Sequence, residues 1–181
     1  MKVFFSVLLI AISTISWQTK RSQFYAPLTN ADRKKYVLSV DQQKITKPET
    51  TKSKVYLNEM FSTIVVKLSN NSSDSLKYVT MSCSWMDNFI TNNLKFAIGV
   101  CDCDSNFPDV KIIPPHKTAF FTIRILYKKR LATRDNHFKI GMLIVKDLKE
   151  NQPIDFISEY FSQKKYMANM IWSNPVKIPQ Y

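Results

Sequence analysis

Glycine is almost absent from this chain. Only two of its 181 residues are glycine, Gly99 and Gly141, and both lie in stretches that predict strands. Loops that hold a nucleotide phosphate need several glycines, because the backbone must approach the anion closely. The sequence therefore excludes nucleotide-dependent enzymes of the P-loop and dinucleotide-binding types. We expect no nucleotide ligand and no cofactor.

Residues that bind metals or act as nucleophiles are also few. The chain has two histidines and three cysteines, without paired C-x-x-C or H-x-x-H spacing, so no zinc site is predicted. It also lacks a Gly-x-Ser-x-Gly motif. We expect no enzyme; the alternative is a small hydrolase that uses His116 or His137. His116 follows two prolines, which is typical of a surface turn.

A calcium-loop pattern starts at Asp102 but breaks down where its geometry is strictest. Phe107 stands where the loop must turn sharply, and Ile113 stands where a bidentate glutamate is required. We therefore expect no metal and interpret the segment as a turn. The alternative is a different cage of oxygen ligands, formed by Asp102, Asp104, Asn106 and Asp109.

Long apolar runs are absent except at the N-terminus. Lys2 precedes an almost wholly apolar run over 3–12, and the small residues Thr14 and Ser16 occupy the positions that a signal peptidase requires. The run is too short to span a bilayer, which needs about 20 apolar residues. The pattern predicts a signal peptide over 1–16, cleaved before Trp17. We expect a secreted or periplasmic protein with no transmembrane segment in the mature chain.

Acidic residues are heavily outnumbered. The chain has 26 Lys and Arg against 14 Asp and Glu, a net charge of +12. This excess favours an anionic partner, and for an exported protein an envelope glycan is favoured over nucleic acid. The densest basic cluster, our candidate anion-binding site, consists of Lys128, Lys129, Arg130 and Arg134. The alternative interpretation is a basic, soluble surface with a solvated hairpin tip.

Three cysteines in an exported chain indicate one disulfide and one remaining thiol. Cys83 can pair with Cys101 or Cys103, and closing that loop would stabilise the fold by roughly 3 kcal/mol. Cys101 and Cys103 cannot comfortably pair with each other, because residues two apart on an extended strand hold their sulfur atoms too far apart.

Most of the chain shows the two-residue period of half-buried strands. After a flexible lead-in over 17–35, the domain is predicted to span 36–181. Strands are predicted over 36–41, 55–68, 76–85, 94–101, 110–113, 119–127, 138–145 and 166–173. The strands 76–85 and 94–101 are expected to form a hairpin pinned by the disulfide, with Val79, Met81, Cys83 and Trp85 in the core. A short amphipathic helix is predicted over 153–163.

This order of elements predicts an all-β fold, an antiparallel immunoglobulin-like β-sandwich of about seven or eight strands with one short helix near the C-terminus. Trp85 departs from antibody domains, where the tryptophan and the first cysteine lie on different strands. Loops at the ends of such a scaffold, here 86–93, 102–109 and 128–137, would make the contacts of a binding protein.

A resemblance agrees with this interpretation. The segments Met81-Ser82-Cys83-Ser84-Trp85, Cys103-Asp104-Ser105-Asn106-Phe107-Pro108 and Ile171-Trp172-Ser173-Asn174-Pro175 resemble small secreted β-sandwich proteins of Bacteroidota bacteria. The resemblance covers roughly residues 36–178 and implies that Cys103 is the partner of Cys83. It implies no activity.

Together these observations predict a secreted, non-catalytic binding or structural module at the cell envelope or outside the cell. Its partner would be an anionic envelope glycan or another secreted protein. The alternative is an inhibitor-like module whose loops block a hydrolase. The turn over 70–75 also carries sequences that permit sugar attachment, at Asn70, Asn71 or Ser75, but a plain turn is the favoured interpretation.

Overall fold

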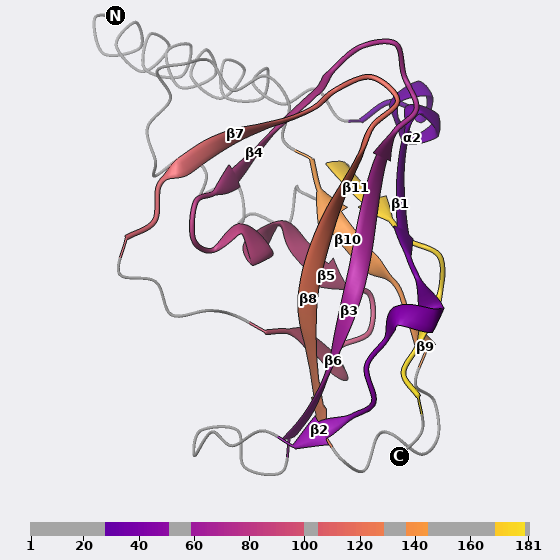
Figure 1. Cartoon of the computed structure of the whole chain (residues 1–181), viewed down its shortest axis with the longest axis vertical. Coiled ribbons are helices and arrows are strands. Elements are labelled where there is room, and N and C mark those ends of the chain that lie inside the picture. Colours follow the sequence, from indigo (N-terminus) through magenta and orange to yellow (C-terminus); the bar gives the residue numbers. More distant parts are fainter. Residues whose placement is uncertain (1–27, 51–58, 100–104, 129–136, 145–168, 180–181) are drawn as a thin grey trace, which may run out of the picture.

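The computed structural model describes residues 28–50, 59–99, 105–128, 137–144 and 169–179 (Figure 1). Their secondary structure is mostly antiparallel β with only short helical pieces, as the sequence predicted. Several predictions lie outside these residues: the signal peptide over 1–16, the helix over 153–163, and the residues Cys101, Asp102, Cys103, Asp104, Lys129, Arg130 and Arg134.

The largest sheet has five strands and is curled like half of a barrel (Figure 1). Its strand order is β1, β3, β8, β6, and β2 also pairs with β3. All the pairs are antiparallel, and β3 and β8 stay in register from Glu59 opposite Lys128 to Ser69 opposite Thr118. The strands are β1 (Tyr36–Val40), β2 (Glu49–Thr50), β3 (Glu59–Asn70), β6 (Phe96–Ile98) and β8 (Thr118–Lys128).

The period-two pattern explains how this sheet is buried. Along β3, buried residues alternate strictly with half-buried ones, and Ile64, Val66 and Leu68 are fully buried. They face Ile123 and other alternate residues of β8 across the register. The predicted two-residue period of both strands is therefore confirmed, because one set of alternate residues is buried when the sheet packs.

A second, three-stranded sheet has the order β11, β10, β5. The strands of a separate short pair, β9 and β12, come just before β10 and just after β11 in the chain. Phe89, Ile140 and Met142 from the second sheet belong to the same buried cluster as Ile64 and Ile123 from the first. One core is thus shared by the two sheets. The strands are β5 (Phe89–Thr91), β9 (His137–Phe138), β10 (Ile140–Leu143), β11 (Met170–Trp172) and β12 (Val176–Lys177).

A two-stranded ribbon, β4 (Leu76–Met81) with β7 (Pro108–Ile113), completes the described strands; we call it the arm. Both of its strands follow directly from the long pair: β3 turns into β4 through 71–75, and β7 turns into β8 through 114–117. Figure 1 shows the arm leaving the upper ends of β3 and β8 and running off to one side.

The predicted hairpin between 76–85 and 94–101 is wrong. β4 pairs with β7, whereas β6 pairs with β8. The chain between them, predicted as a turn over 86–93, forms the 3-10 helix η2 (Trp85–Asn88) and then β5, which pairs with β10 in the other sheet. The two predicted strands do not pair because η2 and β5 lead the chain to the other sheet between them. β5 has only three residues, too few for its period to be recognised in the sequence.

The predicted core face of 76–85 is only partly correct. Val79 is buried, but Met81, Cys83 and Trp85 are only half-buried, and Tyr78 and Thr80 of the opposite face are buried. The strand ends at Met81, so the two-residue alternation does not apply to Cys83 and Trp85. Trp85 instead packs its ring near those of Phe89 and Phe121, with centroids about 6 Å away in each case.

The described residues form twelve strands, more than the seven or eight expected. Six of the twelve have only two or three residues, which is too short for a two-residue period to be recognised in the sequence. The segment predicted as a lead-in contains α2 (Asn30–Lys35), whose first turn is closed by a capping box between Thr29 and Asp32. Another 3-10 helix, η1 (Gln42–Lys44), follows β1. No helix in the described ranges is long and apolar enough to cross a membrane.

Candidate binding surfaces

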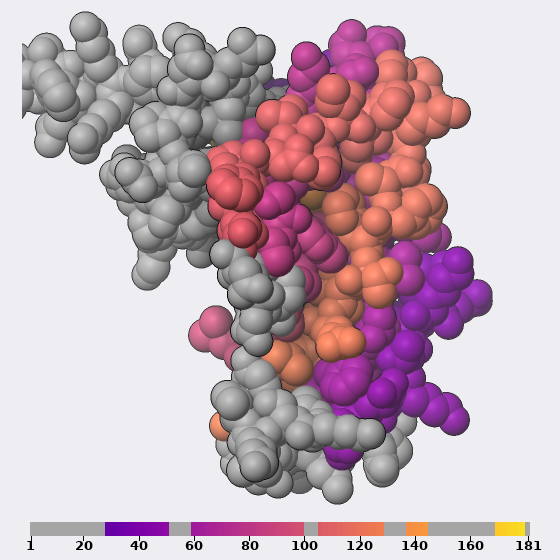
Figure 2. Space-filling model, turned by 60° about the vertical axis from the view of Figure 1, so that its left-hand side comes forward, coloured from indigo at the N-terminus to yellow at the C-terminus, as the bar shows by residue number. Residues whose placement is uncertain are grey.

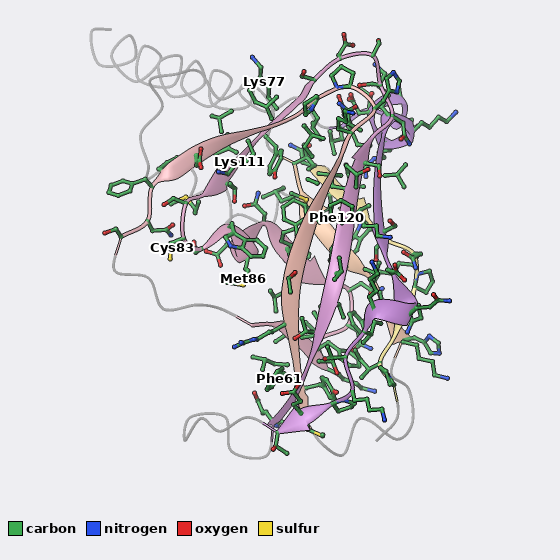
Figure 3. The ribbon with its side chains drawn as sticks, in the orientation of Figure 1. Phe61, Lys77, Cys83, Met86, Lys111 and Phe120 are labelled. Atoms are coloured by element: carbon green, nitrogen blue, oxygen red, sulfur yellow. The ribbon has the colours of Figure 1, made fainter. Side chains whose placement is uncertain are left out.

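The solvent-facing side of the β3–β8 pair carries aromatic and basic side chains together. We call this surface the outer face. Alternation along β8 turns Phe120, Arg124 and Lys128 outward, and all three are exposed. Figure 3 shows Phe61 near the lower ends of β3 and β8 and Phe120 higher on the same pair. The outer face comprises Glu59, Phe61, Thr63, Val65, Lys67, Ser69, Thr118, Phe120, Thr122, Arg124, Leu126 and Lys128.

Arg124 is held in place on this face. Its guanidinium carbon lies 5.5 Å from the centre of the Phe61 ring, a cation–π distance. On the neighbouring side, the Gly99 N–H donates to the Arg124 carbonyl oxygen at 2.8 Å. A Cβ atom at position 99 would lie only 3.1 Å from the Arg124 Cβ, so glycine leaves the room that this close approach needs.

Neither Arg124 nor Lys128 forms an ion pair within the described residues, although Glu59 stands opposite Lys128 in the register. Lys67, on the same face, differs: its ammonium lies 3.2 Å from the Asp41 carboxylate. The hydrogen bond from Lys67 lowers the pKa of Asp41, so the Asp41 carboxylate is ionised at neutral pH. Arg124 and Lys128 are therefore the cations of the outer face that can meet an external anion.

The predicted basic cluster adjoins the outer face. Lys128 ends β8 and points to the same side as Arg124, since the two are an even number of residues apart on one strand. Lys129, Arg130 and Arg134 follow in sequence, outside the described residues, and their joint site remains a prediction.

The tip of the arm is closed by the side chain of Asn106. The Asn106 Oδ1 atom accepts hydrogen bonds from the backbone N–H groups of Cys83 and Ser84, both at 3.2 Å. Its Nδ2 group donates to Ser84 Oγ at 2.7 Å. Asp109 instead forms an ion pair with Lys111 at 2.5 Å. These two members of the alternative oxygen cage therefore serve separate contacts, and the described residues contain no cluster of three metal-binding side chains.

Cys83 lies beside η2, close to the tip of the arm (Figure 3), and is disulfide-bonded. No disulfide joins two of the described residues, because the other two cysteines lie outside them. The choice between Cys101 and Cys103 as its partner stays a prediction.

The structure does not join the histidines to a nucleophile. His116 lies in the turn between β7 and β8 with a φ of 56°, and the turn closes through a hydrogen bond from Lys117 N–H to the Pro114 carbonyl oxygen at 3.2 Å. This confirms the turn expected at His116. His137 is exposed at the start of β9, opposite Lys177. Neither imidazole is hydrogen-bonded to another described residue.

A set of asparagines holds the chain reversals together and was not predicted from the sequence; two of them, Asn70 and Asn88, are buried. Asn88 is the link between the arm and the second sheet: its Nδ2 group donates to the carbonyl oxygens of Val79 and Leu143, at 2.9 and 3.2 Å. Its Oδ1 atom is buried without a hydrogen-bond partner. The signal that could have revealed this set is the scarcity of glycine, since turns without glycine need side chains to satisfy their backbone groups. The set comprises Asn70, Asn88, Asn106 and Asn174.

Comparison with known proteins assigns neither surface: no protein-family model matches the chain, and no curated protein matches it. The outer face and the arm therefore have to be interpreted from their own chemistry. The first is basic and partly aromatic. The second is mainly apolar along one strand, as its exposed Val110 and Ile112 show.

Proposed function

We propose that this protein is a secreted, non-catalytic binding module that recognises an acidic polysaccharide at the cell envelope or outside the cell. Its recognition surface is the outer face together with the basic loop that follows Lys128. The observation that carries the proposal is the exposed Arg124 guanidinium, stacked on Phe61 and without an ion pair to a described residue.

A stacked guanidinium suits this role. Phe61 lies against the guanidinium while the Arg124 side chain stays exposed, so less side-chain entropy is lost when an anion binds. Carboxylate and sulfate groups accept paired hydrogen bonds from such an edge. Lys128 adds a second cation on the same side, and the net charge of +12 attracts polyanions over longer range.

We also infer the setting of this surface. The core shared by the two sheets supports a β-sandwich of immunoglobulin-like build, in which the outer face is one of the two solvent-facing sides. The pattern over 1–16 supports export, and the resemblance to secreted proteins of Bacteroidota bacteria supports the same location.

The test is binding of the exported chain to dextran sulfate, with uncharged dextran as the ligand control. We expect affinity for dextran sulfate to fall steeply with salt, because each neutralised anion releases counterions. Arg124→Gln should weaken binding by about three- to tenfold, in line with the loss of one partly desolvated cation, and Arg124→Lys should weaken it less.

A matched pair of triple variants tests the basic loop. Lys128→Glu, Lys129→Glu and Arg130→Glu together should nearly abolish binding. The same charge change at the exposed Lys44, Lys47 and Lys177, which lie off the outer face, should leave most of it. Equal loss in both triple variants would show attraction by net charge alone and contradict the proposed surface. Turnover of any polysaccharide that disappears with His116→Ala or His137→Ala would contradict a non-catalytic role.

A further inference from the structure

The outer edge of β7 is an open strand edge. Within the described part of the chain, β7 pairs with β4 and with no other strand. Ser82 N–H donates to the Phe107 carbonyl oxygen at 2.7 Å. This bond shows which residue pairs of the β4–β7 ladder are hydrogen-bonded to each other and which are not. Because hydrogen-bonded and non-hydrogen-bonded pairs alternate, the backbone groups of Val110 and Ile112 point away from β4.

The two edges of the arm differ in whether these outward backbone groups are hydrogen-bonded. On β4 the carbonyl of Val79 points away from β7 and accepts a hydrogen bond from Asn88 at 2.9 Å. On β7 the outward groups of Val110 and Ile112 have no partner among the described residues. Among the described residues, the arm is therefore covered at Val79 of β4 and open along β7.

The open edge is also apolar. The side chains of Phe107, Val110 and Ile112 are 61%, 56% and 56% exposed. Figure 2 shows the atoms of β7 on the surface of the face turned forward. Native proteins usually protect such an edge with unpaired lysines, bulges or a covering element. Here the edge has a proline at its start, and its one lysine, Lys111, is neutralised by Asp109.

We propose that a second copy of this chain binds along this edge, its β7 antiparallel to the first, so that the two arms form one continuous four-stranded sheet. Such a pairing is two-fold symmetric, which requires a strand that is complementary to itself. The charges on β7 meet this requirement. With Val110 opposite Val110 of the second copy, Asp109 stands opposite Lys111 of that copy, and Lys111 stands opposite its Asp109.

This register is the one that sets opposite charges against each other on both sides of its centre. The outward backbone groups are those of Val110 and Ile112 and the carbonyl of Pro108, which has no N–H, so they meet only when the strands shift by whole steps of the ladder. One step in one direction sets Lys111 opposite Lys111, and one step in the other sets Asp109 opposite Asp109. Like charges directly opposite destabilise a strand pair. In the register centred on Val110, the apolar side chains of Ile112 and Pro108 also face each other.

The experiment is the oligomeric state of the exported chain, measured by sedimentation equilibrium without any polysaccharide, with the disulfide intact and the remaining free thiol blocked by alkylation. We expect a dimer. Asp109→Lys alone should weaken it by on the order of tenfold or more, because it sets lysines opposite each other, and Lys111→Asp alone should do the same by opposing aspartates. Lys34→Asp, an equal charge change on α2, should leave the dimer intact.

Mixing the two single variants gives the decisive result. A chain with lysine at 109 and 111 and a chain with aspartate at both should form a heterodimer, while each alone is monomeric. The circular dichroism of each variant confirms that it is folded. A wild-type monomer at its highest soluble concentration, or variants that dimerise like the wild type, would overturn the proposal. So would the absence of a heterodimer in the mixture. These results are independent of glycan binding, so the two proposals can fail separately.

Discussion

At the scale of single residues, side-chain amides hold this chain where it reverses direction. Asn70 is the clearest case, because it is fully buried where β3 turns toward the arm. Its Nδ2 group lies within hydrogen-bond distance of the carbonyl oxygens of Asp74, Ile113 and Pro114, and its Oδ1 accepts from Ser72. One amide thus ties together the two turns through which β3–β8 continues into β4–β7.

We predict that Asn70→Ala lowers the free energy of unfolding by about 2 to 3 kcal/mol, since it leaves several buried backbone carbonyls without donors. Urea denaturation followed by circular dichroism measures this loss. Asn71→Ala is the matched control, because Asn71 is the next residue in the same turn but is exposed, and it should change stability little. A similar loss in both variants would show that the corner does not depend on the Asn70 amide.

The same contacts bear on sugar attachment at this turn. An N-linked glycan on Asn70 would need the Nδ2 atom that is buried and donates to backbone carbonyls. Folding of the corner and glycosylation of Asn70 therefore exclude each other. Asn71 and Ser75 are exposed and carry no such restriction.

Tyr78 gives the arm a pH dependence. Burial, reinforced by the negative charge of Asp109, raises the pKa of Tyr78 to about 12 from an ordinary value of 10.0. Below pH 10 the folded and unfolded chains both keep the phenol proton, so the stabilisation is fully present. Between pH 10 and about 12 the unfolded chain loses that proton first, and stability falls as the pH rises.

We predict that Tyr78→Phe makes stability less sensitive to pH across this window. The substitution removes the titrating group, and no described residue is hydrogen-bonded to the Tyr78 hydroxyl. Denaturation midpoints at pH 8, 10 and 11 measure the effect for the wild type and the variant. Some alkaline loss should remain, because burial also raises the pKa of Tyr127. Parallel pH profiles for the two proteins would contradict the assignment.

At the scale of elements, the two-residue period predicted burial better than it predicted pairing. It placed Ile64, Val66 and Leu68 on one face of a strand, and the structure buries that face; the sequence of a single strand is enough to show which residues share a face. It could not show that β4 pairs with β7, since that choice depends on how η2 and β5 lead the chain to the second sheet. The stacking of Arg124 on Phe61 was missed for the same reason, as it needs the register between two strands.

Gly141 controls how closely β10 and β11 pack. It has no positive φ, so its role is steric rather than conformational. A Cβ atom there would lie 2.5 Å from Met170 Cε and 2.8 Å from Trp172 Cζ3. Both side chains come from β11, which pairs with β10 at this position.

We predict that Gly141→Ala destabilises the protein by about 1 to 3 kcal/mol, the usual cost of overpacking a close-packed site. Chemical denaturation measures the loss. Gly99→Ala is the graded comparison: its nearest contact would be 3.1 Å, so it should cost less. The reverse order of the two variants would show that the second sheet has room to adjust around an added methyl group.

At the scale of the whole molecule, the two proposed surfaces lie on different parts of one body. The outer face belongs to the long β3–β8 pair, while the dimer edge belongs to the arm that continues from it. Pairing through β7 would therefore leave both outer faces available. Two linked outer faces would bind a repetitive polyanion more tightly than one, provided that both can reach the same polymer.

The disulfide of Cys83 ties the tip of the arm to the chain that leads back toward β7. Either candidate partner closes a loop of about 20 residues, and constraining such a loop in the unfolded chain is worth roughly 3 kcal/mol. We predict that reduction lowers the free energy of unfolding by about this amount. Alkylation of the unreduced, unfolded protein followed by mass spectrometry should label one thiol per chain.

Two single variants then identify the partner. The resemblance to secreted Bacteroidota proteins implies Cys103, so Cys103→Ser should lose the stabilisation while Cys101→Ser keeps it. Cys83→Ser, which removes the bond in either pairing, sets the scale of the full loss. If Cys101→Ser is the damaging variant, Cys101 is the partner and the resemblance misassigned it. If Cys83→Ser leaves the unfolding free energy unchanged, the arm is held by the Asn106 and Asn88 contacts alone, and the disulfide contributes nothing to stability.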